Sequence, residues 1–252
     1  MARLAIVSAM RQELQALLQL MPDEQAQRRA GRDFWLGHLQ GHEVVAVLSR
    51  IGKVAAATTA SVLIERFDVD RIVFTGVAGG LAPGVAVGDM VVAQSFMQHD
   101  LDASPIFPRY EVPLYGVSRF DTDMVLSECL LAAARSVVME PASLHFPDPT
   151  FGSGRLAPRV HHGLIVSGDR FVSSGAEART LQHALPEALA VEMEGAALAQ
   201  VCHDYGVPFA AVRTISDRAD DTAHVDFLSF IDQVASRYSA AIVGHLLRAL
   251  PR

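Results

Sequence analysis

The chain has 252 residues, half of them apolar, and a formal net charge of −7 at pH 7. This length suffices for a substantial core, and a mild negative charge without a Lys/Arg run excludes a typical nucleic-acid binder. Two cysteines, Cys129 and Cys202, are too few for a disulfide scaffold and lack metal-ligand spacing, and no apolar run approaches the ~20 residues that span a bilayer. We therefore expect a cytoplasmic protein with no metal, no membrane partner and no nucleic-acid partner.

Apolar periodicity predicts strands and helices that alternate along most of the chain. Such alternation is typical of an α/β fold with a mainly parallel sheet. In chain order we predict a strand over 4–7, a helix over 10–20, a hairpin over 34–39 and 44–48, a helix over 53–67, strands over 71–75 and 89–94, a helix over 121–138, a strand over 164–167, a helix over 176–184, a strand over 188–191, a helix over 193–205, a strand over 208–215 and a last helix with an apolar stripe from Val234 to Leu250.

The chain shows no linker-like segment and no internal repeat, so we predict a single domain over residues 1–252. Residues 139–160 interrupt the regular pattern with several prolines and glycines. Such a composition indicates a loop, and we interpret this segment as an insertion into the domain.

A glycine cluster, Gly76-Val77-Ala78-Gly79-Gly80, directly follows the predicted strand over 71–75. Glycines at such a place let the backbone turn tightly and approach a ligand, and ligands of α/β sheets bind beyond the carboxyl ends of strands. The spacing matches neither a dinucleotide fingerprint nor a phosphate-binding P-loop. By itself the cluster is most simply a turn between a strand and a loop.

Four carboxylates lie near the ends of predicted strands, and none of them is decisive alone. Glu192 and Glu194 are either ribose-binding acceptors or a charge pair at a helix N-terminus. Asp217 is either a general acid or a turn residue. Glu13 by itself reads most simply as a solvated helix residue.

Together these positions predict a glycosidic-bond site. If the sheet is parallel, the strand ends converge on one rim, where several carboxylates would lie beside the glycine cluster. Cleavage of a glycosidic bond needs one carboxyl group that protonates the leaving group and another that activates water on the opposite face.

Several ordered segments identify the chain as similar to a known family: Ile6-Val7-Ser8-Ala9-Met10-Arg11-Gln12-Glu13, Ser49-Arg50-Ile51-Gly52-Lys53-Val54-Ala55, 75–81, Val87-Gly88-Asp89, Ser167-Gly168-Asp169-Arg170-Phe171, Val191-Glu192-Met193-Glu194 and Ile215-Ser216-Asp217. They resemble the purine and uridine phosphorylase superfamily and, within it, the 5′-methylthioadenosine/S-adenosylhomocysteine nucleosidases. The resemblance covers nearly the whole chain except about 139–160. It implies a three-layer α/β/α domain with a mixed, largely parallel sheet, a homodimer, and hydrolysis of the adenine–ribose bond of a small nucleoside without metal or cofactor.

The resemblance also implies roles for three carboxylates. Glu13 would be the general base that activates water. Asp217 would be the general acid that protonates nitrogen 7 of the leaving adenine, and Glu194 would bind the ribose hydroxyls. An oxocarbenium-like transition state is stabilised by such carboxylates, and adenine leaves more readily once it is protonated.

The remaining site residues follow from the same resemblance. Phe171 would stack on the base, the backbone of Val172 would read its edge, and Met193 would pack on the sugar. Phe107 and Pro113 would line the 5′-substituent pocket of the partner subunit. The other residues expected around the substrate are Ile51, Val77, Ala78, Gly79, Glu192, Arg213 and Ser216, of which the last two would support the water and Asp217.

Two related activities remain open at this point. Val77 stands where many relatives carry a hydroxyl residue, which removes one possible contact to water or phosphate and argues mildly against a phosphorylase. A purine nucleoside phosphorylase would need cations near the nucleophile, for which Arg50 and Arg213 are candidates. A nucleosidase for another 5′-substituted adenosine, such as aminodeoxyfutalosine, would use the same catalytic residues. A binding protein without turnover would not need the acid and the base.

Overall fold

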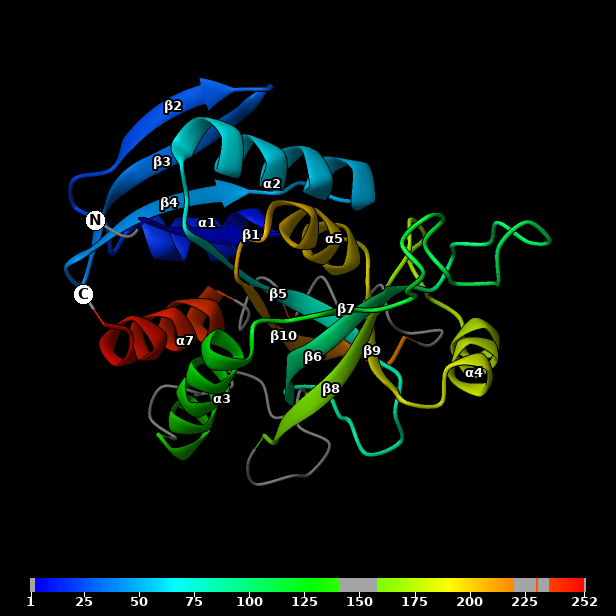
Figure 1. Cartoon of the computed structure of the whole chain (residues 1–252). Coiled ribbons are helices and arrows are strands. Elements are labelled where there is room, and N and C mark those ends of the chain that lie inside the picture. Colours follow the sequence, from blue (N-terminus) through cyan, green and yellow to red (C-terminus); the bar gives the residue numbers. More distant parts are fainter. Residues whose placement is uncertain (1–2, 141–157, 220–229, 231–235, 252) are drawn as a thin grey trace.

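A computed structural model describes residues 3–140, 158–219, 230 and 236–251 of the chain, with helices on both faces of one mixed sheet (Figure 1). The strands are β1 (Arg3–Ser8), β2 (Gln25–Arg29), β3 (Arg32–Leu39), β4 (His42–Leu48), β5 (Arg71–Gly80), β6 (Met90–Gln98), β7 (Phe120–Asp121), β8 (Val160–Ser167), β9 (Ala188–Glu192) and β10 (Phe209–Asp217). The helices are α1 (Arg11–Leu18), α2 (Lys53–Phe67), α3 (Met124–Met139), α4 (Gly175–Ala184), α5 (Gly195–Tyr205) and α7 (Ser236–Ala249).

The described strands form one sheet in the order β10-β6-β8-β9-β5-β1-β4-β3-β2, with β7 paired to β6. An additional pairing between β10 and β5 closes β5, β10, β6, β8 and β9 into a ring. The pairings of β1 with β4 and β5, of β5 with β10 and of β8 with β6 and β9 are parallel. Antiparallel pairings occur in the hairpins and where the ring closes, between β5 and β9 and between β6 and β10.

Two hydrophobic layers sandwich the sheet. Helices α1, α3 and α7 cover one face, and Leu17, Leu130 and Ile242 belong to its core cluster. Helices α2 and α5 cover the other face, where Leu63 and Leu198 are fully buried. The predicted α/β fold with helices on both faces of a mixed sheet is thereby confirmed, and the ring of strands is an addition that the sequence pattern did not indicate.

Local sequence explains where several elements begin and end. Asp123 accepts a hydrogen bond from the amide of Leu126 at 2.8 Å and so caps α3, and Ser174 caps α4 in the same way. Helix α5 ends at Gly206, whose φ of 65° lies in the left-handed region. The α2 boundaries agree with the predicted 53–67.

Other predicted boundaries were wrong in instructive ways. Strand β5 continues through the glycine cluster to Gly80, and β10 continues to Asp217. Strand β2 was not predicted because all its side chains are exposed, so it carries no apolar alternation. The predicted insertion at 139–160 begins at the last residue of α3 and ends at the first of β8, and most of it lies outside the described residues, as does Val234.

No helix in the described part of the chain has the length and apolarity needed to cross a membrane. Of the two cysteines, Cys202 is buried within α5, and burial raises the pKa of its thiol to about 12. Cys129 is partly exposed.

Candidate active site

A cavity of about 310 Å³ lies where β5, β9 and β10 end. This is the size of a small-molecule site. It brings together predicted residues from five separate parts of the chain, namely Ile51, Val77, Ala78, Gly79, Phe171, Val172, Glu192, Met193, Glu194, Ser216 and Asp217. Ala9, Met10, Arg170 and Val191 also line it. They were not predicted as site residues, although all four fall inside or beside the segments that carry the family resemblance.

The glycine cluster does not form the turn that we expected. Gly76, Gly79 and Gly80 belong to β5, which pairs in parallel with β10 and, at its end, antiparallel with β9. These glycines instead provide space, since a methyl group on Gly79 would lie 2.9 Å from Oδ1 of Asp217. The absence of side chains lets the acidic end of β10 lie directly against β5.

Asp217 is the last residue of β10 and is 1% exposed. The hydroxyl of Ser216 donates to its Oδ2 at 2.8 Å, and the amide of Ala219 donates to its Oδ1 at 2.8 Å. A hydroxyl can both donate and accept, so Ser216 can serve either the ionised or the protonated carboxyl group. Asp217 therefore lies on the cavity wall, held by its own strand end.

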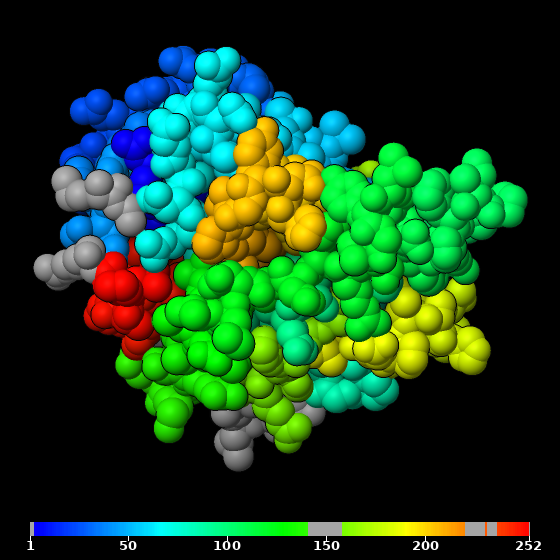
Figure 2. All heavy atoms as spheres, in the orientation of Figure 1, coloured from blue at the N-terminus to red at the C-terminus, as the bar shows by residue number. Residues whose placement is uncertain are grey.

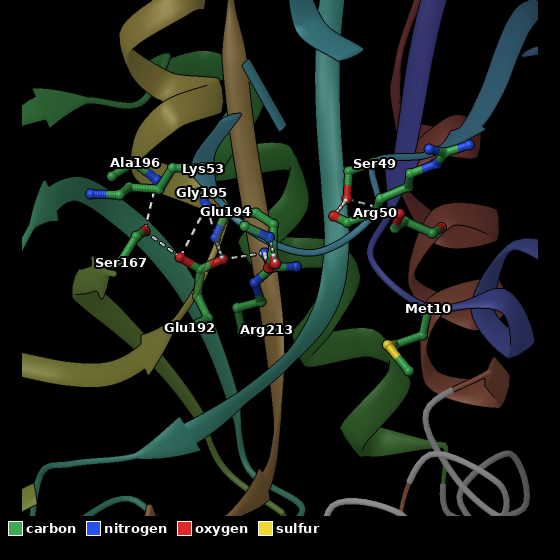
Figure 3. A network of polar contacts seen from close by, with 12 residues as sticks. Met10, Ser49, Arg50, Lys53, Ser167, Glu192, Glu194, Gly195, Ala196 and Arg213 are labelled. Atoms are coloured by element: carbon green, nitrogen blue, oxygen red, sulfur yellow. Dashed lines mark hydrogen bonds and ion pairs between the residues drawn. The ribbon is translucent and has the colours of Figure 1, made fainter. Parts of the chain in front are cut away.

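Glu192 is the centre of a buried hydrogen-bond network (Figure 3). Its carboxylate accepts bonds from the Ser167 hydroxyl, from the amides of Glu194 and Gly195, and from Nη2 of Arg213 at 2.5 Å. These donors occupy the carboxylate oxygens. Glu192 lines the cavity, but its carboxylate is used to hold the start of α5 and the guanidinium group of Arg213.

Glu194 differs from Glu192 in having few hydrogen bonds. Its Oε1 accepts from the amide of Gly52 at 2.9 Å, and its Oε2 lies 3.9 Å from Nη2 of Arg213. Burial, with the negative charge of Glu192 next to it, raises the pKa of Glu194 to about 7. Glu194 therefore has acceptor capacity left for a ligand, whereas the neighbouring Glu192 has little.

Glu13 is fully buried and is not the solvated residue that its sequence position suggested. It is the third residue of α1 and reaches back to the helix start, where the amide of Met10 donates to its Oε2 at 3.1 Å. Ser239 of α7 donates to its Oε1 at 3.2 Å. Burial raises the pKa of Glu13 to about 7, although the positive charge of Arg213 lowers it. Glu13 itself does not line the cavity, whereas Met10, to whose amide it is bonded, and Ala9 do.

Arg213 joins these carboxylates although it does not line the cavity. Its side chain is fully buried, and its guanidinium carbon lies 3.6 Å from the ring centroid of Phe74. Among the described residues, its Nη1 and Nε have no hydrogen-bond partner. A buried donor without a partner favours a water molecule or a polar ligand atom beside it.

A second polar cluster holds two loops at the cavity mouth. Nζ of Lys53 donates to Oδ1 of Asp100 at 2.6 Å and to Oε1 of Gln98 at 3.0 Å. Asp169 accepts from the amide of Lys53 at 2.7 Å, and its own amide donates to Asp100 at 2.8 Å. This cluster ties the segment around Ile51 to the segment that leads into Phe171.

Besides Glu13 and Arg213, the predicted residues Phe107 and Pro113 and the phosphorylase candidate Arg50 do not line this cavity. Phe107 and Pro113 lie in the chain between β6 and β7, which projects from the body of the molecule (Figures 1 and 2). The proposed contribution of these two residues to a partner subunit's pocket stays a prediction. The guanidinium of Arg50 donates to the carbonyl of Gly31 and points away from the Glu192 network (Figure 3).

The described residues contain no group of three His, Cys, Asp or Glu side chains that could hold a metal ion. The arrangement is that of a small-molecule site lined by the carboxylates of Glu192, Glu194 and Asp217, with Glu13 and the cation of Arg213 buried outside the lining.

Comparisons with known proteins agree with this geometry. The sequence model of the family described as "Phosphorylase superfamily" matches residues 3–248. The structure of a 5′-methylthioadenosine/S-adenosylhomocysteine nucleosidase from Neisseria meningitidis, in complex with methylthio-immucillin-A, is 35% identical and superposes with a TM-score of 0.87, covering 99% of this chain and 100% of that chain.

Two further structures are similar over the same extent. The corresponding nucleosidase from Streptococcus pneumoniae, bound to a transition-state inhibitor, is 34% identical with a TM-score of 0.83 and covers 99% of this chain and 100% of that chain. A structure described as a futalosine hydrolase mutant of Helicobacter pylori strain 26695 is 30% identical with a TM-score of 0.84 and the same coverage.

Proposed function

We propose a reaction for this chain from the family to which it belongs. The chain is a member of the phosphorylase superfamily and, within it, of the 5′-methylthioadenosine/S-adenosylhomocysteine nucleosidases, which are N-ribosyl hydrolases. It hydrolyses the bond between N9 of adenine and C1′ of the ribose in 5′-methylthioadenosine and S-adenosylhomocysteine, and releases adenine and a 5′-thioribose. The observation that carries this proposal is that Glu194 and Asp217 line one cavity, while the buried carboxylate of Glu13 is bonded to the amide of Met10, which lines the same cavity.

Glu13 acts as the general base. Its pKa of about 7 leaves a large fraction ionised near neutral pH, so it can take a proton from a water molecule. The oxygen of that water attacks C1′, and the electron pair of the broken bond passes to the adenine. The unpartnered Nη1 of Arg213 is suited to hold a buried water molecule.

Asp217 acts as the general acid and donates a proton to nitrogen 7 of the leaving adenine. Its contact with the hydroxyl of Ser216 at 2.8 Å supports either protonation state of the carboxyl group. Glu194 accepts hydrogen bonds from the ribose hydroxyls while Met193 packs on the sugar, Phe171 stacks on the base and the backbone of Val172 reads its edge. No step requires a metal or a cofactor.

Water is favoured over phosphate as the nucleophile. Phosphate needs several free cations, but Arg50 is bonded to Gly31 and Nη2 of Arg213 is bonded to Glu192. The buried carboxyl group of Glu13 would repel phosphate once it is ionised. Val77, where many relatives have a hydroxyl residue, offers phosphate no hydrogen bond.

An assay of adenine release with and without inorganic phosphate tests this reaction. The purified protein is expected to release adenine from 5′-methylthioadenosine at the same rate in both conditions. Strict dependence on phosphate would contradict the proposal and favour a purine nucleoside phosphorylase.

A nucleosidase for aminodeoxyfutalosine is the second candidate, because one similar structure is described as a futalosine hydrolase mutant. The catalytic groups would be the same, and only the pocket for the 5′-substituent would differ. Comparison of kcat/KM for 5′-methylthioadenosine, S-adenosylhomocysteine and aminodeoxyfutalosine discriminates between the two. We expect the two thioether substrates to have the higher values.

We also propose that the protein is a homodimer. Ile51, which lines the cavity, and Val54 of α2, together with Ile106 and Leu114 in the projecting segment, are each more than 60% exposed. Exposed apolar side chains of this size are typical of a protein interface. Sedimentation velocity should give a dimer, and Ile106→Asp should weaken it and raise KM, as expected if the partner's Phe107 and Pro113 complete the pocket.

A further inference from the structure

Helix α7 contributes one polar side chain to the immediate surroundings of Glu13. The helix packs against α1 (Figure 1), and its buried face is apolar except for Ser239 and the neighbouring Tyr238. Ser239 is 3% exposed, and its hydroxyl donates to Oε1 of Glu13 at 3.2 Å. Neither the residue types nor their spacing in the sequence predicts this contact between Ser239 and Glu13.

The geometry points to Ser239 as a positioning residue that holds the carboxylate of Glu13 in its ionised, water-activating orientation. This inference rests on the proposed function, because it assigns a role relative to the general base. It adds the C-terminal helix to the elements that form the site.

The two oxygens of Glu13 are held by donors from two different helix regions, the start of α1 and α7. Oε2 accepts from the amide of Met10 at 3.1 Å, and Oε1 accepts from Ser239 at 3.2 Å. A donor on each oxygen restricts rotation of the carboxylate about its last bond, and Ser239 is the side chain that supplies the donor to Oε1. Each oxygen retains a lone pair, so the group can still accept a proton from water.

The charged surroundings make this neutral donor important. Burial raises the pKa of Glu13, and the charge of Arg213, the Met10 amide, the Ser239 hydroxyl and the Ala9 amide lower it. On the packed elements, Arg11 of α1 and Arg237 of α7 are exposed to solvent, and Glu43 of β4 pairs with Arg3.

Tyr238 does not alter this balance. Burial is the largest cause that raises its pKa, so the phenol stays neutral over the working range of the enzyme. On α7, Ser239 is therefore the group that favours the ionised form of Glu13, because a hydrogen bond to a carboxylate stabilises its charge.

The pH dependence of kcat/KM for adenine release tests this role. In Ser239→Ala the acidic limb of the profile should move to higher pH by about half a unit to one unit, which lowers kcat/KM about 3- to 10-fold at pH 6. Above the pKa the value should stay within about twofold of the unaltered protein. Ser239→Thr keeps the hydroxyl and should restore the limb.

Ser127→Ala is the matched control. Ser127 is likewise buried on a helix, but its hydroxyl donates to the hydroxyl of Thr122 and not to a carboxylate, and this variant should leave the acidic limb in place. An unmoved limb in Ser239→Ala, or an equal loss of kcat/KM at every pH, would overturn the positioning role.

A direct titration separates failure of this inference from failure of the proposed function. Carbon-13 NMR of labelled glutamate, with the Glu13 signal assigned by its loss in Glu13→Gln, follows the carboxyl group without any substrate. The midpoint should be higher in Ser239→Ala than in the unaltered protein, and Ser239→Cys, with a weaker donor, should lie between them. A protein that titrates in this order but releases no adenine would contradict the proposed reaction alone, and an unchanged midpoint would contradict the role of Ser239 alone.

Discussion

A methyl group added to Gly76 would lie 2.1 Å from Nη1 of Arg213, closer than any tolerable contact. The guanidinium group therefore occupies the space that a side chain at position 76 would fill. Arg213 cannot retreat easily, because it lies between the Phe74 ring and the carboxylate of Glu192.

Gly76→Ala should consequently displace Arg213 and weaken its bond to Glu192. Overpacking of this kind costs about 1–3 kcal/mol of the free energy of unfolding. Thermal unfolding should show a Tm lower by several degrees, and kcat/KM should fall as well. Gly84→Ala is the control, since a methyl group there meets nothing within 4 Å, and equal behaviour of the two variants would remove the steric argument.

Asp217→Asn should retain nucleoside binding and lose most turnover. The amide has nearly the same shape as the carboxyl group but cannot transfer the proton to adenine, and loss of a general acid typically costs about 10²–10⁴-fold in rate. Single-turnover release of adenine gives the rate, and isothermal titration with a substrate analogue gives the affinity. Near-normal turnover would exclude Asp217 from the mechanism.

Glu13→Gln should alter how stability depends on pH. The pKa of Glu13 is about 7 in the folded protein against an ordinary value of 4.5, so the folded state binds this proton more tightly than the unfolded state. The contribution of this proton to the free energy of unfolding is fully present below about pH 4.5 and is lost as pH rises through about 7.

The glutamine side chain never ionises and avoids this loss. In urea unfolding, the free energy of unfolding of Glu13→Gln relative to that of the unaltered protein should therefore increase between pH 5 and pH 8, by on the order of 1–3 kcal/mol. Glu187→Gln is the control, because that carboxylate lies at the surface beside Arg119 and has a lowered pKa. A gain that does not depend on pH would contradict the buried ionisation.

Lys53→Met should affect substrate binding more than the chemical step. Methionine keeps the apolar stem but loses the bonds to Asp100 and Gln98 that hold the segment leading into Phe171. KM should rise roughly 3- to 10-fold with little change in kcat, as expected when uniform binding is lost. Arg119→Met breaks an exposed pair with Glu187, which is worth little, and should leave both constants unchanged.

Much of the fold could be predicted because apolar periodicity follows burial. Strand β1 and helix α2 are strongly patterned, and their predicted positions agree with the structure within two residues. The ring closure could not be predicted, because the pairing of β10 with both β5 and β6 joins residues far apart in the chain. An exposed strand such as β2 carries no such pattern at all.

The sequence predicted most of the residues of the candidate site, but not the different hydrogen-bonding and burial of its individual carboxylates. The sequence does not indicate that Glu192 has donors on both oxygens whereas Glu194 can still accept hydrogen bonds. This difference arises because Ser167 and Arg213 both donate to Glu192 in the folded chain. The burial of Glu13 could not be predicted from the sequence of its own helix either. It depends on Ser239 and α7, which follow more than two hundred residues later.

The ring of strands also affects how the molecule behaves at high concentration. Closure of β5, β10, β6, β8 and β9 leaves β2 as the outermost strand of the described sheet path. All five of its side chains are exposed, and Arg28 and Arg29 carry positive charge along it. Because charged side chains on an open edge discourage pairing with strands of another molecule, this edge resists the aggregation that an apolar edge would promote.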